Sequence, residues 1–347
     1  MPPTIARAQG LWSPERVYLN TASYGLPPRP AWDALQAVLA DWRAGRTSWE
    51  RWGDATEGAR AVFAELVGVD VATVATGATV SGLVGLIAAS IPDGARVLAP
   101  DIEFTSDLFP FLVQAKRGVT VRTVPPSVLV DEIDAGTDVV VASAVQMATG
   151  EVLDLEALEA AASRHDVTTV IDVTQACGWL PIDASRFDAV VCAAYKWLMS
   201  PRGTAFMSVR PRLLERIVPH AAGWYAGEDP HQTYFGGPLR LARTARRLDV
   251  SPAWFSWVGA LPALELVREI GVPAIHQHDL RLANRFRAGL GLPPSDSAIV
   301  CVDAPQAADE LERAGIMAAV RGGRLRTSWH VYNTDADVDA TLEALSG

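Results

Sequence analysis

The chain has 347 residues, a formal net charge of -10 and 49% hydrophobic residues. A chain of this length and apolar content can bury a large core, which excludes both a disulfide-stabilised mini-protein and a disordered polypeptide. The acidic balance argues against nucleic-acid binding, because that function draws on clustered lysine and arginine.

Between residues 71 and 210, short β-branched runs alternate with segments of helical periodicity. The runs predict strands at Val71–Ala75, Arg96–Ala99, Val119–Val124, Asp138–Ser143, Thr168–Asp172, Ala189–Ala193 and Thr204–Val209. The periodic segments predict helices at Val80–Ser90, Asp107–Arg117 and Leu153–Arg164. This alternation predicts an α/β fold in which a mostly parallel sheet is sandwiched by helices, with ligands bound outside the carboxyl ends of the strands.

After Pro252 the pattern changes to that of a small α+β unit. Helices are predicted at Ala253–Ile270, Pro273–Leu290 and Gln306–Ala314 and from Ala336 onward, and strands at Ala298–Asp303, Met317–Val320 and Arg324–Ser328. We therefore expect a large domain over residues 1–250 and a small C-terminal domain over residues 251–347, with part of the N-terminal segment packed against the small domain.

The cysteines and the apolar stretches predict the compartment. Cys177, Cys192 and Cys301 are widely spaced and form no C-x-x-C motif, which is typical of free thiols in a reducing compartment. The amino end has no apolar signal core, and the stretch Leu83–Ile91 is too short to span a bilayer. We expect a cytoplasmic protein without a membrane anchor.

Only two of the 30 basic residues are lysines, Lys116 and Lys196. Asp172 ends one predicted buried strand, and Lys196 follows the end of the next. A carboxylate and an amine at one edge of a sheet suit pyridoxal phosphate, because the acid keeps the ring nitrogen protonated while the lysine forms a Schiff base. Taken singly, Asp172 would be read as a helix cap and Lys196 as a solvated loop residue.

The turn Gly77-Ala78-Thr79 joins a predicted strand to a helix and is a candidate anion site, because backbone N–H groups are free at a helix N-terminus. It is neither a Walker loop nor a G-x-G-x-x-G motif, and by itself such a turn is more often a plain helix cap than an anion site.

Over nearly its whole length the chain resembles the class V aminotransferases, a family of fold-type I pyridoxal phosphate enzymes. Seven pieces in family order carry the resemblance: Tyr18–Ser23, Gly77–Thr79, Glu103–Ser106, Asp172–Gln175, Tyr195–Leu198 with Pro201–Gly203, Ala245–Arg247, and Leu325–Ser328 ahead of Tyr332–Thr334. The resemblance is to the isopenicillin N epimerase-like and ergothioneine-pathway carbon-sulfur lyase-like branch rather than to cysteine desulfurases, since residues 304–325 contain no cysteine.

The resemblance implies a role for each matching residue. Lys196 would form the Schiff base and then move the α-proton through a quinonoid intermediate, with Asp172 paired to the ring nitrogen. The other implied cofactor-binding residues are Gly77, Ala78, Thr79, Phe104, Gln146, Gln175, Tyr195 and Ser251. Arg326 and Ser23 would bind the substrate, Arg326 because a guanidinium forms paired hydrogen bonds to a carboxylate.

Two positions depart from the family pattern. Ala193 stands where members often carry a hydroxyl that binds the phosphate, and Val250-Ser251 replaces a Gly-Thr pair that reaches the neighbouring subunit's phosphate. The resemblance also implies a homodimer, in which Ser251 retains a hydroxyl for that contact. Phe104 would stack on the cofactor, although core packing explains a phenylalanine at this position nearly as well.

The predicted function is aminotransferase-type chemistry on an amino-acid-like small molecule. A β-eliminating carbon-sulfur lyase, for cysteine conjugates or of the ergothioneine-pathway type, and an amino-acid epimerase remain alternatives. A catalytically inactive regulator that keeps the fold is the non-enzyme alternative. No metal site is predicted, because His276 and His278 do not share a helix face.

Overall fold

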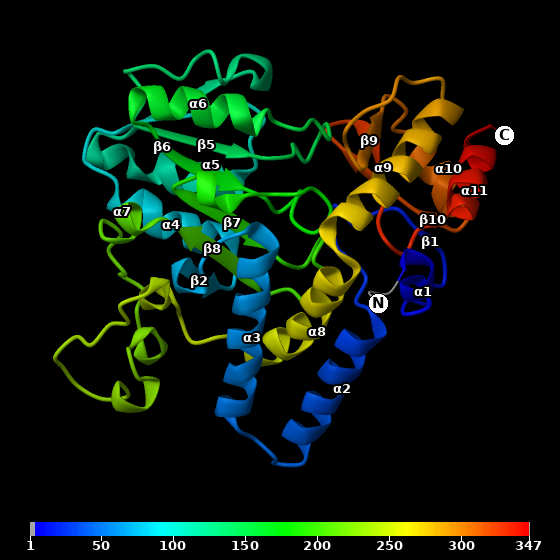
Figure 1. The fold of residues 1–347 in the computed structure, drawn as a ribbon. Helices are drawn as coiled ribbons and strands as arrows, with labels where there is room; N and C mark the ends of the chain where they lie inside the picture. Colours follow the sequence, from blue (N-terminus) through cyan, green and yellow to red (C-terminus); the bar gives the residue numbers. More distant parts are fainter. Residues whose placement is uncertain (1–3, 347) are drawn as a thin grey trace.

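The computed structural model describes residues 4–346, and a seven-stranded sheet forms its centre (Figure 1). The strand order is β2-β8-β7-β6-β5-β3-β4. Their bounds are β2 Val74–Gly77, β3 Arg96–Pro100, β4 Thr120–Val124, β5 Val139–Ser143, β6 Thr168–Asp172, β7 Ala189–Ala193 and β8 Ala205–Val209. Strand β8 runs opposite to the other six strands, which are parallel to one another, so the predicted mostly parallel sheet is confirmed.

Helices cover both faces of this sheet, because its central strands carry apolar side chains on both sides. Along β7, Ala189 and Val191 pack into one core cluster and Val190 and Cys192 into the other. One cluster includes α4 (Val80–Ser90), and the other includes α3 (Trp49–Val67), α6 (Leu155–His165) and α8 (Trp254–Ile270). The predicted sandwich of helices around a sheet is therefore confirmed.

Two predicted elements have different bounds in the structure. The strand predicted from Val71 starts at Val74, because residues 71–73 form a 3-10 turn that the Asp70 side chain caps. The helix predicted from Asp107 to Arg117 begins at Thr105, and its α-helical part, α5, ends at Leu112 before a 3-10 segment. This shift places Asp107 inside the first turn of α5 instead of at its start.

The C-terminal unit contains an antiparallel sheet of β9 (Ile299–Val302), β12 (Arg324–Ser328) and β11 (Ala319–Arg321). The single strand predicted at Met317–Val320 is wrong, because Ile316–Met317 forms a separate strand, β10, which pairs with β1 (Val17–Tyr18). Helices α9 (Val272–Gly289), α10 (Ala307–Arg313) and α11 (Asp335–Ser346) complete the unit. The pairing of β1 with β10 joins the N-terminal segment to this unit.

The remaining elements are α1 (Ile5–Gln9), α2 (Arg29–Arg43) and α7 (Pro211–Leu214). Helix α2 runs beside α8, which also packs against α3, at the lower end of the molecule (Figure 1). No helix within residues 4–346 is both long enough and apolar enough to cross a membrane.

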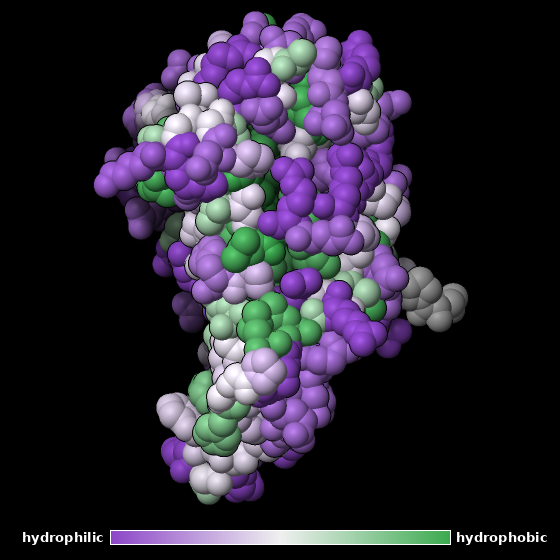
Figure 2. Space-filling model, turned by 90° about the vertical axis from the view of Figure 1, so that its left-hand side faces the viewer, coloured by the Kyte–Doolittle hydropathy of each residue, from purple (hydrophilic) through white to green (hydrophobic). Residues whose placement is uncertain are grey.

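Residues 215–245 form a loop-rich segment that projects from the body on the left of Figure 1. The face on that side of the molecule shows apolar side chains among polar ones (Figure 2). Val218, Tyr234, Phe235 and Leu239 of this segment are exposed, Phe235 to 89% and Leu239 to 81%. Large apolar side chains exposed to this extent are typical of a surface that another protein covers.

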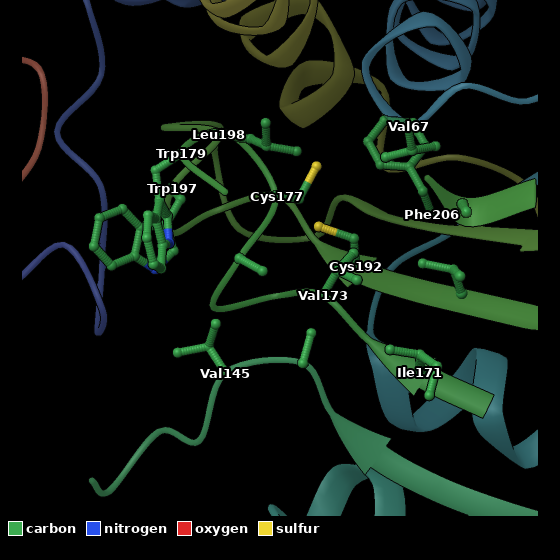
Figure 3. Packing of buried hydrophobic residues seen from close by; sticks show 14 of the residues in the cluster. Val67, Val145, Ile171, Val173, Cys177, Trp179, Cys192, Trp197, Leu198 and Phe206 are labelled. Atoms are coloured by element: carbon green, nitrogen blue, oxygen red, sulfur yellow. The ribbon is translucent and has the colours of Figure 1, made fainter. Parts of the chain in front are cut away.

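Near the carboxyl ends of β6 and β7, Cys177 and Cys192 lie close to one another in the apolar core (Figure 3). Burial raises the pKa of Cys192, and neither thiol forms a disulfide. Cys301 on β9 is also a buried free thiol whose pKa is raised by burial. The predicted free thiols are confirmed, and Cys301 is the packed, unreactive side chain expected from its place in a strand.

Candidate active site

An acidic residue and a lysine lie at the carboxyl edge of the sheet. Asp172 is the last residue of β6, and Lys196 follows β7 by three residues. Both side chains are buried, with 5% and 6% of their surface exposed, and their charges interact. The structure therefore brings together the amine and the carboxylate that the sequence places on successive strands.

The Lys196 amine is buried, which lowers its pKa to about 8. The Asp172 and Asp107 carboxyl groups oppose this shift, and the positive charge of Arg326 adds to it. A lysine with this pKa carries a substantial neutral fraction near neutral pH, unlike an exposed lysine. This neutral fraction is what a nucleophile or proton acceptor requires.

The loop that holds Lys196 is fixed by backbone contacts from both ends of the chain. The Gly25 N–H donates to the Tyr195 carbonyl at 2.9 Å, and a Cβ at Gly25 would lie 2.0 Å from the Lys196 carbonyl oxygen. His330 places Nε2 at 3.0 Å from the Trp197 carbonyl, and its Nδ1 lies 2.9 Å from a carboxylate oxygen of Asp279. Only a glycine at position 25 allows the N-terminal segment to pack this closely.

Asp172 is oriented by the turn that follows it. Its Oδ1 accepts a hydrogen bond from the Thr174 N–H at 2.6 Å, and the Thr174 hydroxyl in turn accepts from the Ala193 N–H at 2.9 Å. These contacts tie the end of β6 to the end of β7 and leave the second oxygen of Asp172 free of this turn. That oxygen is available to a ring nitrogen.

Asp107 is a site residue that the sequence interpretation missed. Its side chain is fully buried, and neither oxygen has a donor partner within residues 4–346. Burial and the nearby carboxylates of Asp172 and Glu103 raise its pKa far above the usual range. Burial beside Asp172 and Glu103 therefore favours the neutral form of the Asp107 carboxyl group. The available signal was an acidic residue in the first turn of a largely apolar helix, next to the Glu103–Ser106 motif.

The predicted phosphate turn is a capped helix N-terminus. The Thr79 hydroxyl accepts from the Gly82 N–H at 3.2 Å and so caps α4, while Ala78 and Thr79 are exposed. A side chain at Gly77 would clash with Leu83, since an added Cβ would lie 2.9 Å from it. The first turn of a helix leaves N–H groups without internal partners, so this exposed turn can receive an anion.

The aromatic residues of the site are accessible. The Phe104 ring centroid lies 5.6 Å from Lys196 Nζ, and the side chain is 37% exposed, so simple core packing does not account for Phe104. Tyr195 lies beside Tyr24, with ring centroids 5.3 Å apart, and the Arg202 guanidinium lies 4.9 Å from the Tyr195 ring. Burial raises the pKa of the Tyr195 hydroxyl.

Both predicted glutamines form hydrogen bonds within the protein. Gln175 donates to the Ala22 carbonyl at 3.0 Å and accepts from Trp197 Nε1 at 2.9 Å. Gln146 donates to the Ile102 carbonyl at 2.8 Å and accepts from the Ala148 N–H at 2.9 Å. Each amide keeps one further N–H, so each can still offer a single donor.

The two predicted substrate residues touch. Arg326 Nη2 donates to the Ser23 hydroxyl at 2.8 Å, and Nη1 donates to the Met147 carbonyl at 3.0 Å. Burial and the nearby Arg321 lower the pKa of Arg326 to about 10. Arg326 remains cationic at neutral pH and acts on Lys196 through its charge.

Ser251 has no hydrogen bond to the other site residues within residues 4–346. It is exposed and follows Asp249, whose carboxylate accepts from the N–H of Thr76 on the edge strand β2. Among the described residues, 4–346, no group of histidine, cysteine and acidic side chains is arranged to hold a metal ion.

Comparison with known proteins identifies the family. The sequence profile described as aminotransferase class-V matches residues 17–309. The chain belongs to the aminotransferase class-V family. It is 28% identical to an uncharacterized aminotransferase, YcbU, of Bacillus subtilis over 86% of this chain and 85% of that protein. It is 27% identical to isopenicillin N epimerase of Streptomyces clavuligerus over 98% of this chain and 96% of that protein.

Among solved structures, the fold matches that of C-DES, a cystine C-S lyase, in a form with glycine covalently linked to its pyridoxal phosphate cofactor. The TM-score is 0.88 at 22% identity, with 99% of each chain covered. The resemblance that the motifs indicated is thus confirmed, and the class V chain is a pyridoxal phosphate-dependent enzyme of the transferase or lyase type.

The residues present fit this cofactor. Lys196 supplies a buried amine of lowered pKa, and Phe104 exposes a ring near that amine. The Thr174 N–H binds only one of the two Asp172 carboxylate oxygens, so the other can accept from the cofactor's ring nitrogen. The turn at Thr79 suits the phosphate, and Ala193 supplies no hydroxyl to it. Pyridoxal phosphate supplies a carbonyl that combines with amines and a ring that accepts electron density from the substrate.

The lowered pKa of Lys196 predicts how cofactor uptake depends on pH. As pH rises through about 8, the amine loses its proton, so the rate of uptake by the cofactor-free protein should rise and then level off. Stopped-flow absorbance across this range measures the rate, and a Lys116→Arg background removes the other lysine. A rate still increasing steeply near the pKa of an exposed lysine, about 10, would contradict the shift.

Proposed function

We propose that this class V enzyme catalyses aminotransferase-type chemistry on an α-amino acid. The observation that carries the proposal is the buried Lys196 amine, whose pKa is lowered to about 8 and whose charge interacts with the Asp172 carboxylate and the Arg326 cation. In this arrangement the Arg326 guanidinium binds the substrate's α-carboxylate, and Ser23 shares that position. The Asp172 oxygen keeps the cofactor's ring nitrogen protonated.

Lys196 then serves as the base. Once its amine is free, the neutral form would accept the proton from the substrate's α-carbon, and the resulting ammonium would donate it to the carbonyl carbon of the cofactor. The ring at the stacking position is Phe104, which has no titratable group. Lys196 is the one base assigned to this site, and one base suits proton transfer between two carbons better than inversion at the α-carbon, which favours aminotransfer over epimerisation.

Elimination is the second candidate. The similarity to the cystine C-S lyase C-DES covers 99% of the chain. At 22% identity it supports a shared fold and does not assign the reaction. The same Lys196 base would remove the α-proton in that reaction as well. In aminotransfer the substrate loses its amino group to the cofactor, and in elimination it first loses the group on its β-carbon. The products therefore distinguish the two reactions.

A substrate panel tests the proposal. The protein saturated with pyridoxal phosphate is incubated with amino acids and cysteine conjugates, with and without an α-keto acid acceptor. We expect a new keto acid to form only when the acceptor is present. Pyruvate with ammonia in the absence of acceptor would show elimination instead, and loss of chirality without a new keto acid would show epimerisation.

We further propose that the protein is a cytoplasmic homodimer with a large domain over residues 1–250 and a small one over residues 251–347. The exposed Phe235 and Leu239 of segment 215–245 support a protein interface on this face. The exposed Ser251 then belongs to the contact with a neighbouring subunit's phosphate. Light scattering measures the mass, and a monomer at working concentration would remove that role for Ser251.

A further inference from the structure

A small hairpin near the site carries three arginines on one face. β11 and β12 pair antiparallel, with Ala319 opposite Arg326 and Arg321 opposite Arg324. Directly opposed residues share a face of the sheet, and so do residues two apart on a strand. Arg321, Arg324 and Arg326 therefore lie on the same face, and the turn Gly322-Gly323, with both φ angles positive, brings the strands together.

Two of these arginines contact the same neutral oxygen. Arg326 Nη2 and Arg321 Nη2 lie 2.8 Å and 3.2 Å from the Ser23 hydroxyl oxygen. Arg321 on β11 and Arg326 on β12 are diagonal neighbours across the hairpin, which lets both reach Ser23. The residue directly opposite Arg326 is the small Ala319, which leaves room for the Arg321 side chain. Two cations thus lie against one uncharged hydroxyl group.

Neither cation is neutralised by the protein. Within residues 4–346, Arg321 and Arg326 form no ion pair with a carboxylate, and the buried Nε of Arg326 has no acceptor. Arg60, which is as deeply buried as Arg326, is paired with Asp249 at 2.6 Å and with Glu57 at 3.0 Å. A buried cation without a counter-charge is unfavourable, so an anionic ligand has an electrostatic reason to bind here.

The α-carboxylate of an amino acid accounts for only one of the two cations. We propose that Arg321 binds a second carboxylate on the substrate's side chain, so that the enzyme selects short acidic amino acids. This inference rests on the proposed function, in which Arg326 binds the α-carboxylate. Because both guanidinium groups reach one Ser23 oxygen, the two carboxylates must lie close together, as they do when two or three carbons separate them.

Arg321 is suited to discriminate among substrates, because it is only half-buried and its other guanidinium nitrogen is held by the Val320 carbonyl at 2.8 Å. Arg324 offers a matched control. It belongs to the same hairpin and face, but its Nη2 donates to the Cys301 carbonyl at 3.3 Å and makes no contact with Ser23.

Calorimetric titration with substrate-like acids tests the inference without any turnover. The probes are succinate and glutarate, compared with propionate and butyrate, on the protein with and without pyridoxal phosphate. We expect the dicarboxylates to bind roughly tenfold more tightly, a difference of the size expected for one charge-assisted contact. Arg321→Gln should remove this preference and leave monocarboxylate binding within about threefold, and Arg324→Gln should keep the preference.

The outcomes separate this inference from the proposed function. If monocarboxylates bind as tightly as dicarboxylates, or if Arg321→Gln weakens both classes equally, both arginines share one carboxylate and the inference is overturned. If no carboxylate of either class binds, Arg326 is not a carboxylate site, and the substrate-binding part of the proposed function fails as well. Thermal denaturation of each variant verifies that the fold is intact.

Discussion

Replacing Lys196 with arginine is expected to lower turnover by roughly 10³-fold or more and to abolish the visible absorbance of the lysine-bound cofactor. Arginine keeps a positive charge and much of the side-chain volume, but it stays protonated and cannot act as the nucleophile or the base. The loss would therefore be chemical, because the backbone contacts from Gly25 and His330 do not involve this side chain.

The chain offers a matched control for this variant, since Lys116 is the only other lysine and is exposed. Reduction of the loaded protein with borohydride, followed by peptide mass spectrometry, should place the cofactor on Lys196 in the wild type and in Lys116→Arg. Cofactor still covalently retained in Lys196→Arg would refute the assignment of this lysine.

Asp172→Asn is expected to reduce turnover by about 10² to 10³-fold, because an amide cannot hold the cofactor's ring nitrogen in its protonated state. The hydrogen bond from the Thr174 N–H would survive, since an amide oxygen can replace the carboxylate oxygen. Single-turnover kinetics should show the loss in the proton-transfer step, with the affinity for the cofactor changed far less.

The neighbouring acid provides a contrasting variant. Because its surroundings favour the neutral form of Asp107, Asp107→Asn keeps an uncharged polar side chain at that place and should lower turnover by less than about tenfold. Asp107→Leu removes the polar group and should cost more. An Asp107→Asn variant as impaired as Asp172→Asn would show that Asp107 carries a negative charge of its own.

Much of the fold followed from local pattern. The buried runs Thr168–Asp172 and Ala189–Ala193 have the bounds that their β-branched and apolar residues predict, since such runs are stable only inside a covered parallel sheet. The strand predicted at Met317–Val320 failed, because its two halves pair with different partners, β1 and β12. The break between β10 and β11 is set by partners that lie elsewhere in the chain, so the local sequence pattern gives no sign of it.

The sequence by itself determined the family and the cofactor, and it proposed Lys196 and Asp172 as the central pair, because a scarce lysine and a strand-end aspartate stand in the order that the family motifs have. Only the tertiary structure decided how these groups are charged. Burial beside Arg326 lowers the pKa of Lys196, and burial beside Asp172 raises that of Asp107. Protonation depends on desolvation and on charges brought close by folding, and neither of these is a property of the linear chain.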